Sequence, residues 1–137
     1  ESASADIVEA LRHLIPQLSS SADPVSPETV ATIVADPATT LFVARHDGAI
    51  VGALTLAVFT TPSGIRAWIE DVVVDGEARG LGAGEALTRA AIDHALAAGA
   101  KSVDLTSRPS RVAANRLYQR VGFVQRETNV YRYSLES

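Results

Sequence analysis

Apolar residues recur at helical spacing in the first third of the chain. Between Ala5 and Leu18 the apolar side chains fall every three or four positions, which predicts an amphipathic helix. Ser26 followed by Pro27 predicts the cap and first turn of a second helix, which ends at about Asp36. The first 36 residues are therefore predicted to form two helices.

The pattern changes to strand-like runs in the middle of the chain. Residues 40–46 and 49–60 form two such runs, and Asp47-Gly48 between them is a strong signal for a two-residue hairpin. A turn at residues 61–64 leads to a third run over residues 66–74. These three segments are expected to pair as neighbouring antiparallel strands.

Helices and strands alternate in the last part of the chain. An alanine-rich helix is predicted to end near residue 98, followed by a strand over residues 101–106 and a helix over residues 112–121. Two short strands are expected within residues 123–135. This order predicts an α/β class, with a central mixed sheet flanked by about four helices in one domain spanning residues 1–137.

The composition excludes several classes of function. Of the 137 residues, 47% are hydrophobic and 20% are charged, which is too apolar for a disordered chain. The absence of cysteine excludes disulfides and thiolate chemistry, and it fits a cytoplasmic location. The net charge of −4 argues against nucleic acid or an anionic membrane as a partner. No pair of histidines has metal-ligand spacing, so no metal is expected.

A glycine-rich loop precedes the alanine-rich helix. Glycines let the backbone approach a ligand, and the N–H groups of a first helical turn favour an anion such as phosphate. The loop is neither a dinucleotide fingerprint, because Glu85 or Leu87 stands at the third glycine position, nor a Walker loop, because it has no lysine. The alternative is a turn without a ligand. The loop consists of Arg79, Gly80, Leu81, Gly82, Ala83 and Gly84.

Two motifs in this chain resemble those of the GNAT N-acetyltransferase superfamily. Arg79-x-x-Gly82-x-Gly84 is similar to the family's acyl-CoA signature, Gln/Arg-x-x-Gly-x-Gly/Ala. Residues 117–123, LYQRVGF, are similar to the family's Leu-Tyr-x-x-x-Gly-Phe segment. The spacing of the two motifs and the order of elements over residues 40–135 also match, so the resemblance covers about two-thirds of the chain.

The chain departs from the family pattern at two places. The family begins with a strand before its first helix, and here that strand is expected to be missing or trimmed. Many members carry an asparagine seven residues before the tyrosine, where this chain has Arg111. Asn115 lies three residues before Tyr118, on the same helical face, and is the candidate for a CoA contact.

The resemblance implies that acetyl-CoA is the acetyl donor. Its pyrophosphate would lie on the N–H groups of residues 79–84, and its pantetheine arm would lie along Val72, Val73 and Val74 like an added strand. The backbone N–H of Val72 or Val73 would face the thioester oxygen. Tyr118 would protonate the departing thiolate; the alternative is a core aromatic residue.

Glu70 and Asp71 are the candidates for the group that accepts the proton of the amine. Neighbours in a regular strand point to opposite faces, so only one of them is expected to reach the acetyl group. Glu70 is favoured, on the face of Val72 and Val74, with Asp71 on the face of Val73. Water as the base, or a structural ion pair with an arginine, remains the alternative.

The expected function is therefore acetyl-CoA-dependent transfer of an acetyl group to a primary amine of a small molecule or peptide. One alternative is a non-catalytic acyl-CoA-binding sensor module, and another is a nucleotide-binding regulatory domain. The loop at residues 107–111 is either a phosphate or carboxylate contact or a solvated loop. The sequence leaves the acceptor open, and a homodimer is possible because dimers are common in the family.

Overall fold

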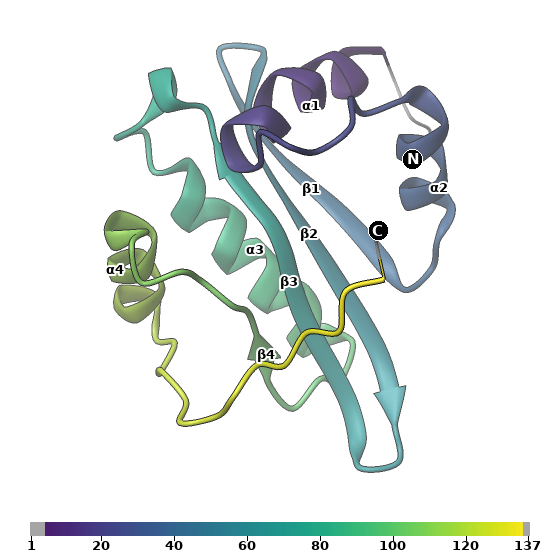
Figure 1. Ribbon diagram of the computed structural model, residues 1–137, viewed down its shortest axis with the longest axis vertical. Coiled ribbons are helices and arrows are strands. Elements are labelled where there is room, and N and C mark those ends of the chain that lie inside the picture. Colours follow the sequence, from purple (N-terminus) through teal and green to yellow (C-terminus); the bar gives the residue numbers. More distant parts are fainter. Residues whose placement is uncertain (1–4, 136–137) are drawn as a thin grey trace. The chain divides into compact units, whose positions relative to one another are not determined.

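The computed structural model describes residues 5–135, which fall in two compact units, Glu1–Thr106 and Ser107–Ser137 (Figure 1). The first unit carries three helices and a four-stranded sheet, and the second carries one helix. The helices are α1 (Ala5–Leu18), α2 (Pro27–Ala35), α3 (Ala83–Ala97) and α4 (Val112–Val121); the strands are β1 (Thr39–His46), β2 (Ala49–Thr61), β3 (Gly64–Val74) and β4 (Val103–Asp104).

The sheet has the strand order β1-β2-β3-β4, with three antiparallel strands and a parallel fourth. Asp47 and Gly48 join β1 to β2 with φ angles of 51° and 83°, the left-handed conformation of the hairpin turn that the sequence predicted. Thr61 and Gly64 pair directly across the second turn. The antiparallel meander expected from the sequence is confirmed.

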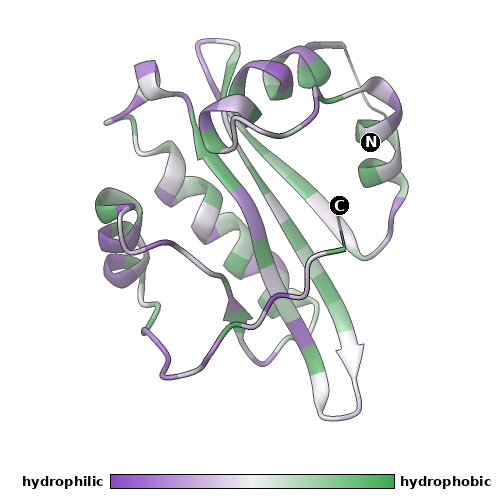
Figure 2. Ribbon diagram, viewed as in Figure 1, coloured by the Kyte–Doolittle hydropathy of each residue, from purple (hydrophilic) through white to green (hydrophobic). Residues whose placement is uncertain are grey.

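Helices cover both faces of this sheet. Ala53 and Val73 pack with α1 and α2 in a core that includes Leu11 and Leu14. Gly52 belongs to the opposite face, where an added Cβ atom would lie 3.1 Å from the Leu87 side chain of α3, a contact that would require Leu87 to shift. In Figure 2, apolar residues run along β2 and β3 between these two layers.

Two predicted strand regions differ from the structure. Only Val103 and Asp104 pair with β3, so the strand expected over residues 101–106 is short. The two strands expected within residues 123–135 were wrong, because the structure assigns no strand there and leaves Tyr131 and Tyr133 almost fully exposed. Alternating apolar residues favour an extended chain, but a strand also needs a paired edge, which alternation does not specify.

Leu54 provides a test of the core, because its side chain is fully buried in the middle of β2. We expect Leu54→Ala to lower the free energy of unfolding by about 2–5 kcal/mol, through lost apolar burial and the cavity left behind. Leu96→Ala is the matched control, since Leu96 is 72% exposed, and a change within about 0.5 kcal/mol is expected for a surface site. Urea unfolding measures both, and equal losses would contradict the assigned core.

Candidate functional site

The glycine-rich loop connects β3 to α3 and is exposed to solvent. After a 3₁₀ turn at Gly76–Ala78, the chain passes through Gly80 and Gly82 with φ angles of 89° and 78°. A Cβ atom at either glycine would meet nothing within 4 Å. Glycine is therefore required here by the left-handed backbone and not by lack of space.

Helix α3 begins directly at the end of this loop without a side-chain cap. Gly82 occupies the N-cap position, and the first helical hydrogen bond runs from Ala86 N–H to the Gly82 carbonyl at 3.0 Å. The N–H groups of the first turn thus point out of the helix, at its positive end. Thr88 Oγ1 donates to the Gly84 carbonyl at 2.7 Å and holds this turn in place. An anion fits this arrangement.

Strand β3 leaves one edge open just before the loop. It pairs with β2 along most of its length, but on its other side β4 pairs only with Ala67 and Trp68. No strand among residues 5–135 pairs with Val72–Val74 on that side. An open strand edge offers N–H and carbonyl groups to an extended ligand.

A bulge in β3 changes the expected directions of Glu70 and Asp71. Thr55 pairs with Glu70 and Ala53 pairs with Val73, so β3 has one more residue than β2 between these pairs. Thr55 and Ala53 share a face of β2, which puts Glu70 on the face of Val73 and not on that of Val74 as the sequence suggested.

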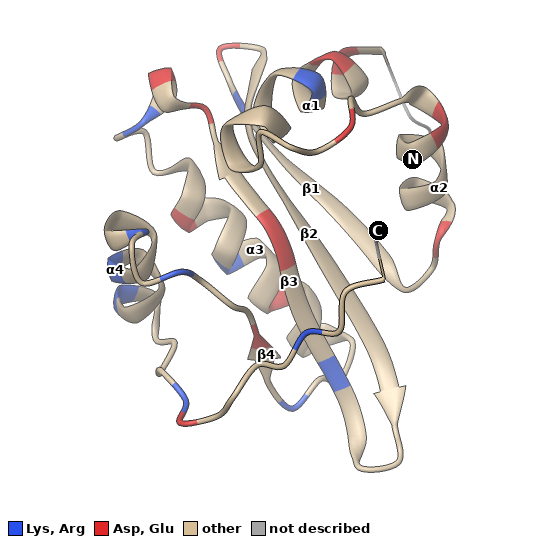
Figure 3. Cartoon of the chain, in the orientation of Figure 1, with Lys and Arg blue, Asp and Glu red and all other residues tan. Residues whose placement is uncertain are grey.

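Asp71 also lies on this face. It has a φ angle of 52°, and its side chain lines a cavity together with Ala53 and Thr55. The expectation that the two carboxylates point to opposite faces was therefore wrong, because strict alternation does not hold across a bulge. Both acids are exposed, and they form the red band on β3 in Figure 3.

Glu70 is held by a neighbour on its own strand. The indole N–H of Trp68 donates a hydrogen bond to Glu70 Oε2. The sequence had suggested an arginine as the alternative partner, whereas the observed partner is two residues away on the same strand face. Trp68 thus fixes Oε2 of the carboxylate, and Oε1 can accept a hydrogen bond or a proton from another group.

Helix α1 is tied to the start of the loop by three polar side chains. Gln17 Oε1 accepts from the Gly76 N–H at 2.9 Å, and His13 Nε2 lies 3.1 Å from Asp75 Oδ2. Since an ionised carboxylate only accepts, Nε2 of His13 must carry the proton. Gln17 Nε2 then donates to the His13 carbonyl at 3.3 Å and not to the ring.

Asp75 is the centre of this connection. It caps the 3₁₀ turn by accepting from the Glu77 N–H at 3.1 Å. That hydrogen bond is the largest cause of a pKa of the Asp75 carboxyl below its ordinary value of 3.8. Burial opposes it, and the contacts with His13 and Gln17 lower the pKa further. The charged form of Asp75 therefore stabilises the segment that leads into the glycine loop.

The second unit carries Tyr118 and Asn115 on α4. The Tyr118 ring contacts Phe123 edge to face, with centroids 5.8 Å apart. Burial raises the pKa of the Tyr118 hydroxyl above 10.0, and the charge of Arg111 offsets this only in part. Asn115 Nδ2 donates to the Arg108 carbonyl at 2.9 Å, so this asparagine holds the loop before α4.

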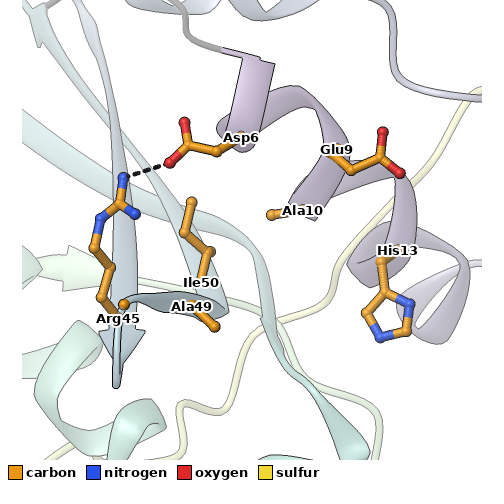
Figure 4. A pocket seen from close by; sticks show the side chains of 8 residues that line it. Asp6, Glu9, Ala10, His13, Arg45, Ala49 and Ile50 are labelled. Carbon is orange, nitrogen blue, oxygen red and sulfur yellow. Dashed lines mark ion pairs between the residues drawn. The ribbon is translucent and has the colours of Figure 1, made fainter.

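Among the hollows of the first unit, two are lined by residues of α1. The larger, about 420 Å³, lies between α1 and the β1–β2 turn (Figure 4). Its Arg45 already pairs with Asp6 at 3.0 Å, and it includes no residue of the glycine loop or of β3. The smaller, about 130 Å³, includes Asp71. Of residues 68–84, Asp71 is the one that lines the smaller cavity.

His46 and His94 make local contacts and are not part of a metal-ligand group within residues 5–135. His94 packs its ring edge against Phe42, and His46 lies beside Asp47 in the hairpin. Within residues 5–135, no three histidine or acidic side chains are grouped as metal ligands. None of the helices in that range is both long and apolar enough to cross a membrane.

The chain matches a model of a known protein family. The model of the "Acetyltransferase (GNAT) family" matches residues 8–123, which is most of the chain. The chain belongs to the GNAT acetyltransferase family. The fold is the GNAT fold that the sequence motifs predicted.

Solved structures similar to this GNAT chain cover nearly its whole length. A protein of Agrobacterium tumefaciens strain C58, assigned as an acetyltransferase, is 28% identical with a TM-score of 0.85, and the match covers 98% of each chain. A transcriptional regulator from Bacillus halodurans C-125 is 27% identical with a TM-score of 0.80, over 98% of this chain and 97% of that one. No match was found among curated proteins.

A third structure similar to the chain contains a CoA derivative. It is AAC(6')-Iy in complex with a bisubstrate analogue, CoA-S-monomethyl-acetylneamine, with a TM-score of 0.79. Identity is 18%, and the match covers 95% of this chain and 92% of that one, so the likeness concerns the fold. GNAT acetyltransferases use acetyl-CoA and an acceptor substrate.

Sequence reasoning missed three side chains around the predicted GNAT motif. Trp68 could have been found from its position two residues before Glu70 on one strand. No sequence motif marks His13 or Gln17, which both lie on the exposed face of α1. Gln17 and Gly76 are 59 positions apart, so no local pattern indicates their contact.

The lowered pKa of Asp75 gives a pH-dependent prediction. Its ionised carboxylate contributes stability that is present above about pH 3.8 and is lost as the pH falls through the lower folded pKa. We therefore expect Asp75→Ala to unfold at lower urea concentration than the parent at pH 7, and the difference to shrink in strong acid. Asp93→Ala, an exposed carboxylate on α3, controls for net charge. A difference independent of pH would contradict this role.

Proposed function

We propose that this GNAT protein transfers an acetyl group from acetyl-CoA directly to the primary amine of a small molecule or peptide. The observation that carries this proposal is the exposed glycine loop at the uncapped start of α3, directly after a strand with an open edge. An anion-binding turn beside an open strand suits a donor that has a pyrophosphate at one end and amide groups along its arm.

The donor would be bound mainly by backbone groups. The N–H groups of Arg79, Gly80, Leu81, Gly82, Ala83 and Gly84 would take the pyrophosphate, and Val72, Val73 and Val74 would pair with the pantetheine amides. Asn115 is proposed to contact CoA through Oδ1, because its Nδ2 is used by Arg108. A backbone N–H of Val72 or Val73 would stabilise the charge that develops on the thioester oxygen.

The transfer needs one proton acceptor and one proton donor. The amine nitrogen attacks the thioester carbon, a C–N bond forms, and the C–S bond breaks. We assign the proton released by the amine to Glu70 Oε1, the oxygen that Trp68 leaves open. The thiolate takes its proton from Tyr118, whose raised pKa keeps the phenol protonated at neutral pH.

Donor binding can be tested with two glycines of matched conformation. Gly82 and Gly48 have φ angles of 78° and 83°, and a Cβ atom at either would meet nothing within 4 Å. Gly82→Val and Gly48→Val therefore carry a similar conformational strain. We expect calorimetry to show at least tenfold weaker acetyl-CoA binding, about 1.4 kcal/mol, for Gly82→Val alone. Equal affinities in the two folded variants would remove the loop from the donor site.

Tyr118→Phe tests the acid, because it removes one hydroxyl and keeps the ring. We expect kcat to fall by about 100-fold, in the lower range for general acid catalysis, while acetyl-CoA affinity changes by less than about 1 kcal/mol. Tyr133→Phe is the matched control, because Tyr133 is 89% exposed. A Tyr118→Phe rate within about threefold of the parent would exclude the assigned role.

The second candidate function is a non-catalytic module that binds acyl-CoA as a signal. The similarity to a protein described as a transcriptional regulator is the observation that favours it. Release of CoA thiol with a panel of amines separates the two functions. Tight acetyl-CoA binding without turnover of any amine would favour the module over the enzyme.

A further inference from the structure

The smaller cavity of the first unit has apolar walls and one charged side chain. It lies on the face of the sheet covered by α1 and α2. Leu11 and Ile15 of α1, Ile33 of α2 and Leu41 of β1 form its apolar walls. Its polar groups include Thr55 of β2 and Asp71 of β3. A site of this composition binds an apolar group and orients it through a single polar end.

Asp71 is placed in this cavity by the bulge of β3. Its φ angle of 52° lies in the left-handed region, which aspartate adopts more readily than most residues other than glycine. The Asp71 carboxylate forms no hydrogen bond or ion pair with any other residue in the range 5–135. Its side chain is exposed, whereas Leu11 is buried. The carboxylate therefore lies where the apolar cavity meets solvent.

The volume limits what the cavity can hold. It measures about 130 Å³, and a protein cavity of about 150 Å³ with apolar walls is known to bind benzene. A group of about four to six carbon atoms thus fits. A sugar ring would bury hydroxyl groups against leucine and isoleucine side chains, and unpaired buried hydroxyls are costly.

We propose that this cavity binds the acetyl acceptor, a primary amine attached to a short apolar group, with its ammonium at the Asp71 carboxylate. This inference rests on the proposed acetyl transfer and adds the chemical class of the acceptor. Glu70 precedes Asp71 in the chain and faces the same side of the sheet. Asp71 therefore holds the ammonium where the cavity meets solvent, which takes one proton so that the nitrogen gains its lone pair. Glu70 takes the second proton as the C–N bond forms, and the apolar walls select the chain attached to the nitrogen.

The chain offers a matched control for the acidic group. Asp47 has a φ angle of 51°, nearly that of Asp71, and lies in the β1–β2 turn away from the cavity. Asparagine also tolerates the left-handed region, so Asp71→Asn and Asp47→Asn remove the same charge with the same backbone requirement. A difference between the two variants then reports the position of the carboxylate and not a change in net charge or stability.

The test measures binding and turnover separately. Calorimetry with isopentylamine hydrochloride gives binding in the absence of acetyl-CoA, and CoA thiol release gives turnover of isopentylamine and of glucosamine. We expect the parent and Asp47→Asn to bind isopentylamine equally, and Asp71→Asn to bind at least tenfold more weakly. We also expect the parent to acetylate isopentylamine with the higher kcat/KM, and Asp71→Asn to raise the KM for this amine while the KM for acetyl-CoA stays unchanged.

The outcomes distinguish the two proposals. Binding of isopentylamine that depends on Asp71 without any turnover would overturn the acetyl transfer but retain the cavity as an amine site. Turnover of glucosamine in preference to isopentylamine, or isopentylamine binding unaffected by Asp71→Asn, would overturn the cavity assignment and leave acetyl transfer standing.

Discussion

The ladder between β2 and β3 accommodates one extra residue of β3 between the pairs Thr55–Glu70 and Ala53–Val73. The placement of the two candidate carboxylates, Glu70 and Asp71, depends on this bulge. Without it, strict alternation would separate Glu70 from Asp71 across the sheet. With it, both acids lie on the face of α1 and α2, and the strand then runs on to the glycine loop. A local irregularity in pairing thus brings a carboxylate pair to one side of the sheet.

The rest of the first unit holds this strand and its loop in place. Helices α1 and α2 pack on one face and α3 on the other, so the position of β3 is fixed from both sides. Helix α1 also reaches the chain just beyond β3, through Gln17 to Gly76 and His13 to Asp75. The same helix supplies walls of the small cavity. Movement of α1 would therefore affect both the loop and the cavity.

Local sequence patterns predicted most of the fold because the interactions that they report are local. The Asp47-Gly48 turn, the cap at Ser26 and the glycine loop each involve residues a few positions apart, and the structure has all three elements. The bulge could not be predicted, because one extra residue is defined only against a partner strand. For the same reason alternation assigned the wrong face to Glu70 and predicted strands in residues 123–135, where no ladder forms.

The open edge of β3 also bears on self-association. Among residues 5–135 no strand pairs with this edge at Val72–Val74. Such an edge is a template on which a strand of another chain can add, and three successive valines make that addition favourable. Two charged residues and a bulge immediately precede these valines. Such devices shorten the flat, apolar stretch that a second chain would need in order to align. Glu70, Asp71 and the bulge thus make this edge a poorer template for an added strand than the three valines alone would be.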